Sequence, residues 1–377
     1  MFDFDRPIDR SAGDSIKWDR YAGRDIVPLW VADMDFAAPP AVLEALHRRI
    51  DHGVFGYGHP WPSLVDAVVA HLEREYGWQV EPNWIVWLPG LVTGLNVACR
   101  AVGTDGDAVF TATPVYPPFL SAPANSRRRA VSAPLVRDEE GWAWDWAGVD
   151  GVLRAARPKL FLLCHPHNPV GRAWREDELR QVLALAEKHD LIVCSDEIHC
   201  DLLLEPGLRH APFAALSEAA ARRTITLMAP SKTFNIPGLG CAFAVIPDVG
   251  LRGAFHRAMD GIVPHVNTLG LVACEAALRE GAAWRQELLA YLRGNARLVA
   301  KFVDTQPLLA ATPVEATYLA WIDARGLGVA NPQRHFEAAG VGLSDGADFG
   351  APGFVRLNFG CRRALLEEAL ARMEKAL

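Results

Sequence analysis

The amino-acid sequence predicts an α/β fold, with a mainly parallel central sheet covered by helices on both faces and a smaller α+β domain toward the C-terminus. Between residues 84 and 246, short apolar runs bounded by turns alternate with helical patterns, as in βαβ units. The runs are apolar throughout, which is typical of parallel strands buried on both faces. After about residue 264 the order changes to long helices and few strands, which indicates a second domain.

Six apolar runs are the expected strands of the central sheet. They are Trp84–Gly90, Asp107–Ala112, Lys159–Cys164, Leu191–Ser195, Thr224–Ala229 and Gly240–Ile246. Helical patterns at residues 91–102 and 176–190 follow two of these runs, with apolar residues three and four positions apart. A strand followed by a helix and another strand predicts parallel pairing, because parallel strands need a long crossover.

The C-terminal part contains two helical patterns with two strand-like runs between them, at residues 282–306, 317–324, 353–360 and 362–377. We expect residues 46–275 to form the large, cofactor-binding domain and residues 276–377 the small one. Residues 1–45 are irregular and rich in proline, and we expect this segment to pack with the small domain.

Composition and charge exclude several classes of partner. The formal net charge is −7 without a basic stripe, so we expect no nucleic acid partner. The first residues lack the order of a signal peptide, and no apolar run approaches the length of about 20 residues that spans a membrane. The seven cysteines are scattered through apolar runs as reduced core residues would be, so we expect a cytoplasmic protein.

One lysine lies in an unusual place. Lys232 follows the apolar run that ends at Ala229 and precedes a turn rich in glycine and proline. Lysine is seldom buried without a partner, so Lys232 is either a surface residue whose stem covers apolar neighbours or a reactive amine. The sequence around Lys232 alone favours the surface interpretation. Ligands of parallel α/β sheets lie outside the carboxyl ends of the strands. The residues that follow the other strands therefore decide between a surface lysine and a reactive amine.

Chemically useful groups follow the other strands too. The segment "GLVTG" (Gly90–Gly94) opens a helix whose backbone amides could hold a phosphate. Further strand ends are followed by Tyr116, Asn168, Asp196 and His199, and Ser231 precedes the lysine. Each has a plain structural alternative: a core aromatic, an Asn-Pro turn, a helix N-cap, a hydrogen-bonded histidine. Together, a phosphate cradle, an aromatic ring, an amide, a carboxylate and a lysine are what pyridoxal 5′-phosphate requires.

Six segments carry a resemblance to a known family: "PLWVADMDF" (Pro28–Phe36), "GVFGYG" (Gly53–Gly58), "HNPVGR" (His167–Arg172), "SDEIHCDL" (Ser195–Leu202), "APSKTFNIPGL" (Ala229–Leu239) and "FVRLNFG" (Phe354–Gly360). On these segments the chain resembles the fold-type I pyridoxal-phosphate enzymes of the class I/II aminotransferase superfamily. Within that superfamily it resembles the cystathionine β-lyase-like C–S lyases of the MalY/PatB type. The resemblance covers nearly the whole chain.

The resemblance implies roles for the residues around the cofactor ring. Lys232 would be the Schiff-base lysine and the acid/base at the substrate Cα, and Asp196 would pair with the pyridine nitrogen. Asn168 would donate to the phenolic oxygen of the cofactor. His199 stands where aminotransferases usually have a tyrosine that bonds the same oxygen, and Tyr116 would stack on the ring.

The resemblance also implies how the two ends of the bound molecule are held. Arg356 would grip the substrate α-carboxylate as a bidentate fork, helped by the Ala32 amide. The phosphate would be held by the Val92 and Thr93 amides, by Ser231 close by, and by Tyr57 of the neighbouring subunit in a homodimer. Many aminotransferases carry an arginine eight residues after the lysine and a serine three before it, where this chain has Gly240 and Ala229. The lyase-like branch also lacks that arginine.

Other site chemistries fit the sequence less well. A P-loop needs glycines before the lysine, and a NAD-binding fold needs a glycine-rich turn after the first strand; the chain has neither. A zinc site would have to come from scattered residues, without a CxxC pair: His165, His167, Cys194, His199 and Cys200. We therefore expect no metal.

Three hypotheses for function remain. The first is α,β-elimination from cystathionine or another S-substituted L-cysteine, which releases a thiol, pyruvate and ammonia. The second is an aminotransferase on the same scaffold, and the third is a non-catalytic regulatory protein that keeps the fold. The intact set of Lys232, Asp196 and Arg356 argues against the third hypothesis.

Overall fold

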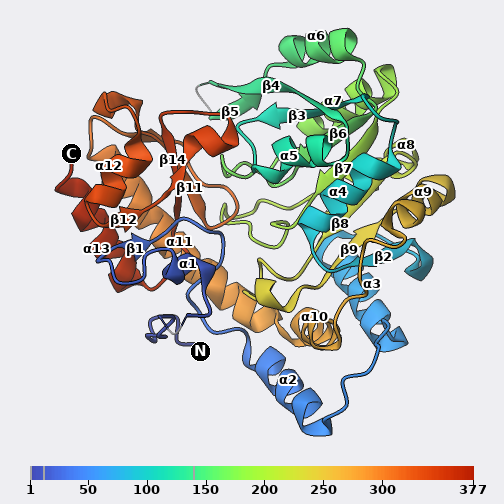
Figure 1. Cartoon of the computed structure of the whole chain (residues 1–377), viewed down its shortest axis with the longest axis horizontal. Helices are drawn as coiled ribbons and strands as arrows, with labels where there is room; N and C mark the ends of the chain where they lie inside the picture. The colour runs from blue at the N-terminus through green and yellow to red at the C-terminus, as the bar shows by residue number, and fades with distance from the viewer. Residues whose placement is uncertain (1, 12, 139–140) are drawn as a thin grey trace.

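Two main sheets organise the chain, as Figure 1 shows in a computed structural model that describes residues 2–11, 13–138 and 141–377. The strands are β1 (Val27–Pro28), β2 (Ile85–Leu88), β3 (Ala108–Thr113), β4 (Arg129–Arg137), β5 (Trp142–Trp144), β6 (Leu160–Cys164), β7 (Ile192–Asp196), β8 (Thr224–Met228), β9 (Ala242–Val245), β10 (Ala310–Ala311), β11 (Leu319–Asp323), β12 (Val341–Gly342), β13 (Ser344–Asp345) and β14 (Phe354–Asn358).

Helices surround both sheets. They are α1 (Ile16–Asp19), α2 (Pro40–His52), α3 (Pro62–Tyr76), α4 (Leu91–Ala101), α5 (Pro118–Asn125), α6 (Trp146–Ala156), α7 (Glu176–Lys188), α8 (Glu218–Ala221), α9 (Val249–Met259), α10 (Thr268–Glu280), α11 (Ala282–Asp304), α12 (Pro332–Ala338) and α13 (Arg363–Glu374). Helix α7 shows how local sequence sets a helix start: its first turn is acidic, and the Glu178 carboxylate accepts the Arg175 amide at 2.7 Å.

The large sheet has the strand order β2-β9-β8-β7-β6-β3-β4-β5. Neighbouring strands from β8 to β4 run parallel, while β9 is antiparallel to β8 and β2, and β5 is antiparallel to β4. The expected mainly parallel sheet is confirmed. Strands β4 and β5 were not expected, because most positions of β4 face solvent and form no continuous apolar run.

Strand β6 shows why the central strands are apolar at every position. Leu160 and Leu162 belong to a core cluster that includes residues of α4 and α9. Phe161 and Leu163 belong to a cluster on the opposite face that includes residues of α6 and α7. Successive side chains of a strand point to opposite faces, so helices on both faces require apolar residues throughout.

The small sheet is antiparallel, with the order β10-β11-β14-β13. Leu319, Ile322, Val355 and Leu357 share one core cluster with α11 and α13. Trp321 and Phe354 belong instead to a cluster that includes residues of the large sheet. The N-terminal segment crosses to this end of the chain, because β1 pairs in parallel with β12, Val27 opposite Val341. The division of the chain at residues 45 and 275 stays a prediction.

Candidate active site

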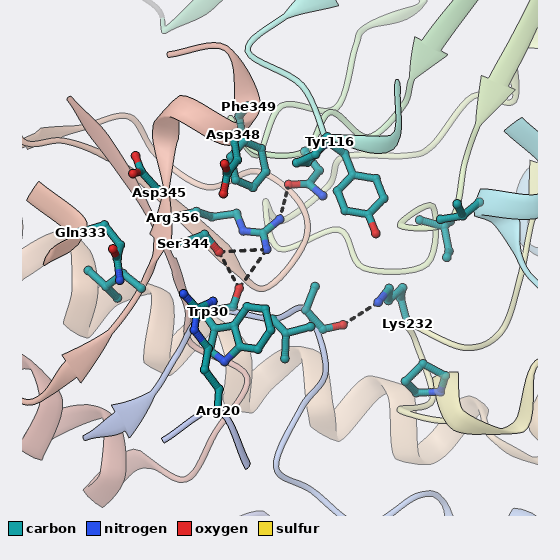
Figure 2. A pocket seen from close by; sticks show the side chains of 18 of the residues that line it. Arg20, Trp30, Tyr116, Lys232, Gln333, Ser344, Asp345, Asp348, Phe349 and Arg356 are labelled. Atoms are coloured by element: carbon teal, nitrogen blue, oxygen red, sulfur yellow. Dashed lines mark hydrogen bonds between the residues drawn. The ribbon is translucent and has the colours of Figure 1, made fainter. Parts of the chain in front are cut away.

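A cavity of about 910 Å³ lies between the carboxyl ends of the parallel strands and the small sheet. Its wall contains every site residue expected from the sequence except Tyr57, namely Ala32, Val92, Thr93, Tyr116, Asn168, Asp196, His199, Ser231, Lys232 and Arg356. Figure 2 shows Lys232, Tyr116 and Arg356 around the same space. The parallel strands end at one edge of the sheet, which brings residues from β3, β6, β7 and β8 together.

Lys232 follows β8 in a turn, and its side chain points into this cavity. Its Nζ donates to the Ala32 carbonyl at 2.6 Å, a neutral acceptor. Burial lowers the pKa of Lys232 to about 8, against the opposing charges of Asp33 and Asp196. A lysine with this pKa carries an appreciable neutral fraction near neutral pH, which a nucleophile or base needs. The position therefore suits a reactive amine better than a surface residue.

Asp196 is the last residue of β7 and is 5% exposed. Its Oδ1 accepts the Ile198 amide at 3.1 Å, so the carboxylate closes a turn and does not cap a helix. Burial raises the pKa of Asp196 to about 7. A buried carboxyl of this kind is stabilised as the anion only when a cation lies opposite it, and a protonated ring nitrogen is such a cation.

Arg356 projects from β14 and is also buried. Its guanidinium donates to the Asn168 side-chain oxygen at 3.0 Å and to the Trp30 carbonyl at 2.9 Å, and it lies over the Phe349 ring. Burial lowers the pKa of Arg356 to about 10, so the group stays charged at neutral pH. No carboxylate pairs with Arg356 among the described residues, so the cavity holds a buried cation that an incoming anion would neutralise.

Three further side chains surround the space between Lys232 and Arg356. Asn168 uses its carbonyl oxygen for Arg356, which leaves its amide hydrogens as donors. Tyr116, whose pKa is raised by burial, is tied to Asn168 through its backbone amide at 3.0 Å. His199 is buried, and its Nδ1 has no partner among the residues that the structure describes. Burial lowers its pKa to about 3, so the ring is neutral. An orphaned nitrogen on a cavity wall fits a polar ligand atom.

The start of α4 forms another part of the cavity wall. Gly90 precedes the helix, and the first amides of a helix, here including those of Val92 and Thr93, have no partner within it. Together with the positive end of the helix dipole, these donors suit a phosphate. Gly240 has φ +56°, and a Cβ there would lie 3.2 Å from the Pro89 carbonyl. The backbone therefore disfavours any side chain, arginine included, at this position.

Tyr57 lies apart from this cavity and is fully exposed, within the segment that links α2 to α3. With Phe55 it lines a separate pocket of about 380 Å³ beside residues 265–269. The chain therefore does not bring Tyr57 to its own site. The role of Tyr57 in a neighbouring subunit's site stays a prediction.

Four residues that contact the expected site residues were not predicted from the sequence. Ser344 and Phe349 contact Arg356, and Trp30 accepts from it. Tyr318, which is almost wholly buried, donates to the same Ala32 carbonyl as Lys232, at 2.9 Å. Trp30 was within a quoted motif, but no local pattern distinguishes the other three from core residues.

The candidate zinc ligands are not assembled as a metal site. Across residues 2–11, 13–138 and 141–377, no group of three or more His, Cys, Asp or Glu side chains could hold a metal ion. His165 stacks on His210, and His167 donates to the Pro114 carbonyl at 2.8 Å. In the same ranges, every helix is too short or too polar to cross a lipid bilayer.

Comparisons with known proteins identify relatives of this chain. Residues 24–373 match the family model "Aminotransferase class I and II". The chain is 38% identical to cystathionine beta-lyase PatB of Bacillus subtilis, over 99% of each chain, and 33% identical to protein MalY of Escherichia coli, over 100% of this chain and 99% of MalY. Among solved structures, OvoB is 50% identical with a TM-score of 0.97, covering 100% of this chain and 99% of OvoB. Cystalysin of Treponema denticola, which contains pyridoxal 5′-phosphate, is 34% identical with a TM-score of 0.95, covering 100% and 98%.

Proposed function

The chain belongs to the class I and II aminotransferase family, and on this basis we propose that it is a pyridoxal 5′-phosphate-dependent carbon–sulfur lyase. Its reaction is α,β-elimination from cystathionine or another S-substituted L-cysteine. The observation that carries the proposal is the convergence of Lys232, Asp196 and Arg356 on one cavity. Relatives that are 33–38% identical over nearly the full length include two named cystathionine beta-lyase. An aspartate aminotransferase of Pyrococcus abyssi is 25% identical and an asparagine–oxo-acid transaminase of Streptococcus mutans 26% identical.

The residues present fit the cofactor. When bound, pyridoxal phosphate supplies an electron sink that stabilises negative charge at the substrate Cα. Asp196 would hold the protonated ring nitrogen and Asn168 the phenolic oxygen, with the orphaned Nδ1 of His199 nearby. The amides of Val92 and Thr93 with Ser231 would hold the phosphate, and Tyr116 would lie against the ring.

The chain's own residues then direct the reaction. Arg356 binds the substrate α-carboxylate and so fixes the Cα–H bond relative to the amine of Lys232. The Lys232 Nζ, whose pKa is lowered to about 8 by burial, accepts the Cα proton. The electrons of the Cβ–S bond leave with sulfur as a thiolate, which takes up a proton. The 2-aminoacrylate that remains is hydrolysed to pyruvate and ammonia. Substrates without a good leaving group on Cβ cannot undergo this elimination.

The test separates elimination from transamination. We expect the purified protein, supplied with cystathionine or cystine and no 2-oxo acid, to release pyruvate and ammonia over many turnovers. An aminotransferase would stop after one equivalent per site and leave the cofactor in its amine form, and that outcome would overturn the proposal. Addition of 2-oxoglutarate is the control: it restores turnover only in the aminotransferase case.

We also propose that the protein is a cytoplasmic homodimer in which Tyr57 reaches the phosphate site of the neighbouring subunit. Val54, Phe55 and Tyr57 are exposed together on the segment after α2, an unusual position for large apolar side chains. All seven cysteines are buried and unpaired, which suits a reducing compartment.

A further inference from the structure

The cavity extends beyond the groups that the reaction uses. Its outer part, here called the outer lobe, is lined by Arg20, Trp30, Gln333, Asp345, Asp348 and Phe349. In Figure 2, Arg20 and Trp30 lie on one side of Arg356, and Asp348 and Phe349 lie on the other. Ligand pockets span about 300–1,000 Å³, so a cavity of about 910 Å³ has room beyond the reacting atoms.

The outer lobe carries charges that the protein itself leaves uncompensated. The Arg20 guanidinium lies 4.6 Å from the centre of the Trp30 ring, and no carboxylate among the described residues pairs with it. Asp348 likewise has no hydrogen bond or ion pair in the described part of the chain. By contrast, Arg24 is paired with Glu337 at 2.9 Å. Both side chains are exposed, so water solvates them and no group among the described residues competes for them. One cation and one carboxylate thus remain available on opposite walls.

A buried polar group adds to this arrangement. Gln333 is only 7% exposed, and its Nε2 donates to Glu337 at 2.8 Å, so its carbonyl oxygen remains an acceptor. Asp345 already accepts from Asn331 at 2.7 Å and from the Ala347 amide at 3.0 Å. Arg334 also reaches the wall, but its guanidinium does not stack on a ring as Arg20 does on Trp30. Arg20 and Asp348 are therefore the charges best placed for a ligand.

We propose that Arg20 and Asp348 determine which sulfur substituent the enzyme accepts. The preferred substituent is dipolar, with a protonated nitrogen toward Asp348 and an anionic group toward Arg20. An uncharged alkyl group would displace water from both charges and return no hydrogen bond. The assignment rests on the proposed function only in that the substrate is a cysteine bound through Arg356.

Four substrates separate the contact with Asp348 from the contact with Arg20. The sulfur substituent of cystathionine carries both an ammonium and a carboxylate. That of S-(2-aminoethyl)cysteine carries only the cation, that of S-(2-carboxyethyl)cysteine only the anion, and that of S-propylcysteine neither. We expect Asp348→Asn to lower kcat/KM for the aminoethyl compound relative to S-propylcysteine by about 2- to 5-fold, because Asp348 is partly screened by solvent. Arg20→Gln should lower the relative value for the carboxyethyl compound by a similar factor, and both variants should lower it for cystathionine. Glu367→Gln, an exposed carboxylate on α13, is the matched control and should leave all ratios unchanged.

Charge reversal and a binding measurement complete the test. Asp348→Lys should shift the preference from the aminoethyl toward the carboxyethyl compound. Calorimetric Kd values in the Lys232→Ala background should follow the same order without turnover. If the substrates bind in this order but the protein with Lys232 intact releases no pyruvate from any of them, the lyase reaction is wrong while the roles of Arg20 and Asp348 stand. Unchanged ratios, or an equal loss for all four substrates, would overturn the roles of Arg20 and Asp348.

Discussion

At the scale of single residues, burial sets the chemistry of the site. It raises the pKa of Asp196 to about 7 and lowers that of Lys232 to about 8, so both groups titrate near neutral pH. Ordinary aspartate and lysine titrate about six units apart. A carboxyl and an amine brought this close in pKa within one cavity are typical of catalytic groups. The same burial keeps His199 neutral and lowers the pKa of Arg356 to about 10.

Replacing Lys232 with alanine tests the central assignment. We expect turnover to fall by about 10²- to 10⁴-fold or more, because the variant loses its general base. The covalent link to the cofactor that borohydride reduction traps should also disappear, as peptide mapping of the reduced protein would show. Lys188→Ala, on the exposed end of α7, is the control. Recovery of the cofactor on another lysine would contradict the assignment.

Arg356→Lys keeps the positive charge but loses the planar fork. We expect KM for an S-substituted cysteine to rise by about 10- to 100-fold, since one of the two bonds to the carboxylate is lost. Ser344→Ala removes a neighbour of the guanidinium at 3.3 Å and controls for altered packing, so it should raise KM far less. A fall in kcat with unchanged KM would speak against carboxylate binding by Arg356.

At the scale of secondary-structure elements, close packing fixes where the site groups project. A Cβ on Gly94 would lie 2.9 Å from the Leu227 side chain, so α4 approaches the sheet more closely than a larger residue would permit. Beyond the end of β7, Asp201 links three elements: it accepts from Tyr76 of α3 at 2.7 Å and from Arg285 of α11 at 2.5 Å. These contacts hold the turn that carries His199.

Asp201 makes a testable contribution to stability. Burial opposes its ionisation, but His71 and Arg285 outweigh burial and hold the pKa of Asp201 well below its usual range. A lowered folded pKa stabilises the fold above the unfolded value of about 3.9, and this stabilisation is lost as pH falls below it. We expect Asp201→Asn to cost about 3–5 kcal/mol at pH 7 in urea unfolding, with a smaller difference below pH 4.

A surface carboxylate provides the matched comparison for Asp201. Asp105 is 60% exposed and pairs with Arg127 and Arg128. Asp105→Asn should cost less than about 1 kcal/mol at any pH, because solvent screens the pairs. Equal effects of the two substitutions would contradict the role given to Asp201.

At the scale of the whole molecule, the cavity forms where the large sheet and the small sheet face each other. Lys232 and Asp196 come from the large sheet and Arg356 from the small one, so the site depends on how the two are held together. The segment with Tyr57 lies outside this arrangement, beyond α2 at the edge of the molecule in Figure 1.

Hybrid dimers test the proposed contribution of Tyr57. Coexpressed Tyr57→Ala and Lys232→Ala subunits should recover roughly a quarter of wild-type activity, because about half of the dimers are hybrids with one intact site. Lys232→Ala coexpressed with Arg356→Ala should recover none, since both damaged residues belong to the subunit's own site. Full activity in a sample shown by sedimentation to be monomeric would contradict a shared site.

The sequence by itself determined the parallel sheet and the groups at its edge. Continuous apolar runs are required where both faces of a strand are buried, and the carboxyl ends of parallel strands meet at one edge of the sheet. Asn168, Asp196 and Lys232 could therefore be placed together from the sequence alone. Strand β4 was missed because its solvent-facing positions leave no apolar run.

Only the tertiary structure decided that Arg356 contacts Trp30 and Phe349. It also decided that Arg20 and Asp348 line the same outer lobe. These residues come from the N-terminal segment and the small sheet, whose orientation toward the large sheet depends on packing of distant segments. No local periodicity or turn encodes that orientation. The sequence does not distinguish an arginine or aspartate that faces a cavity from one that faces open solvent. The elements packed around the side chain determine which of the two it faces.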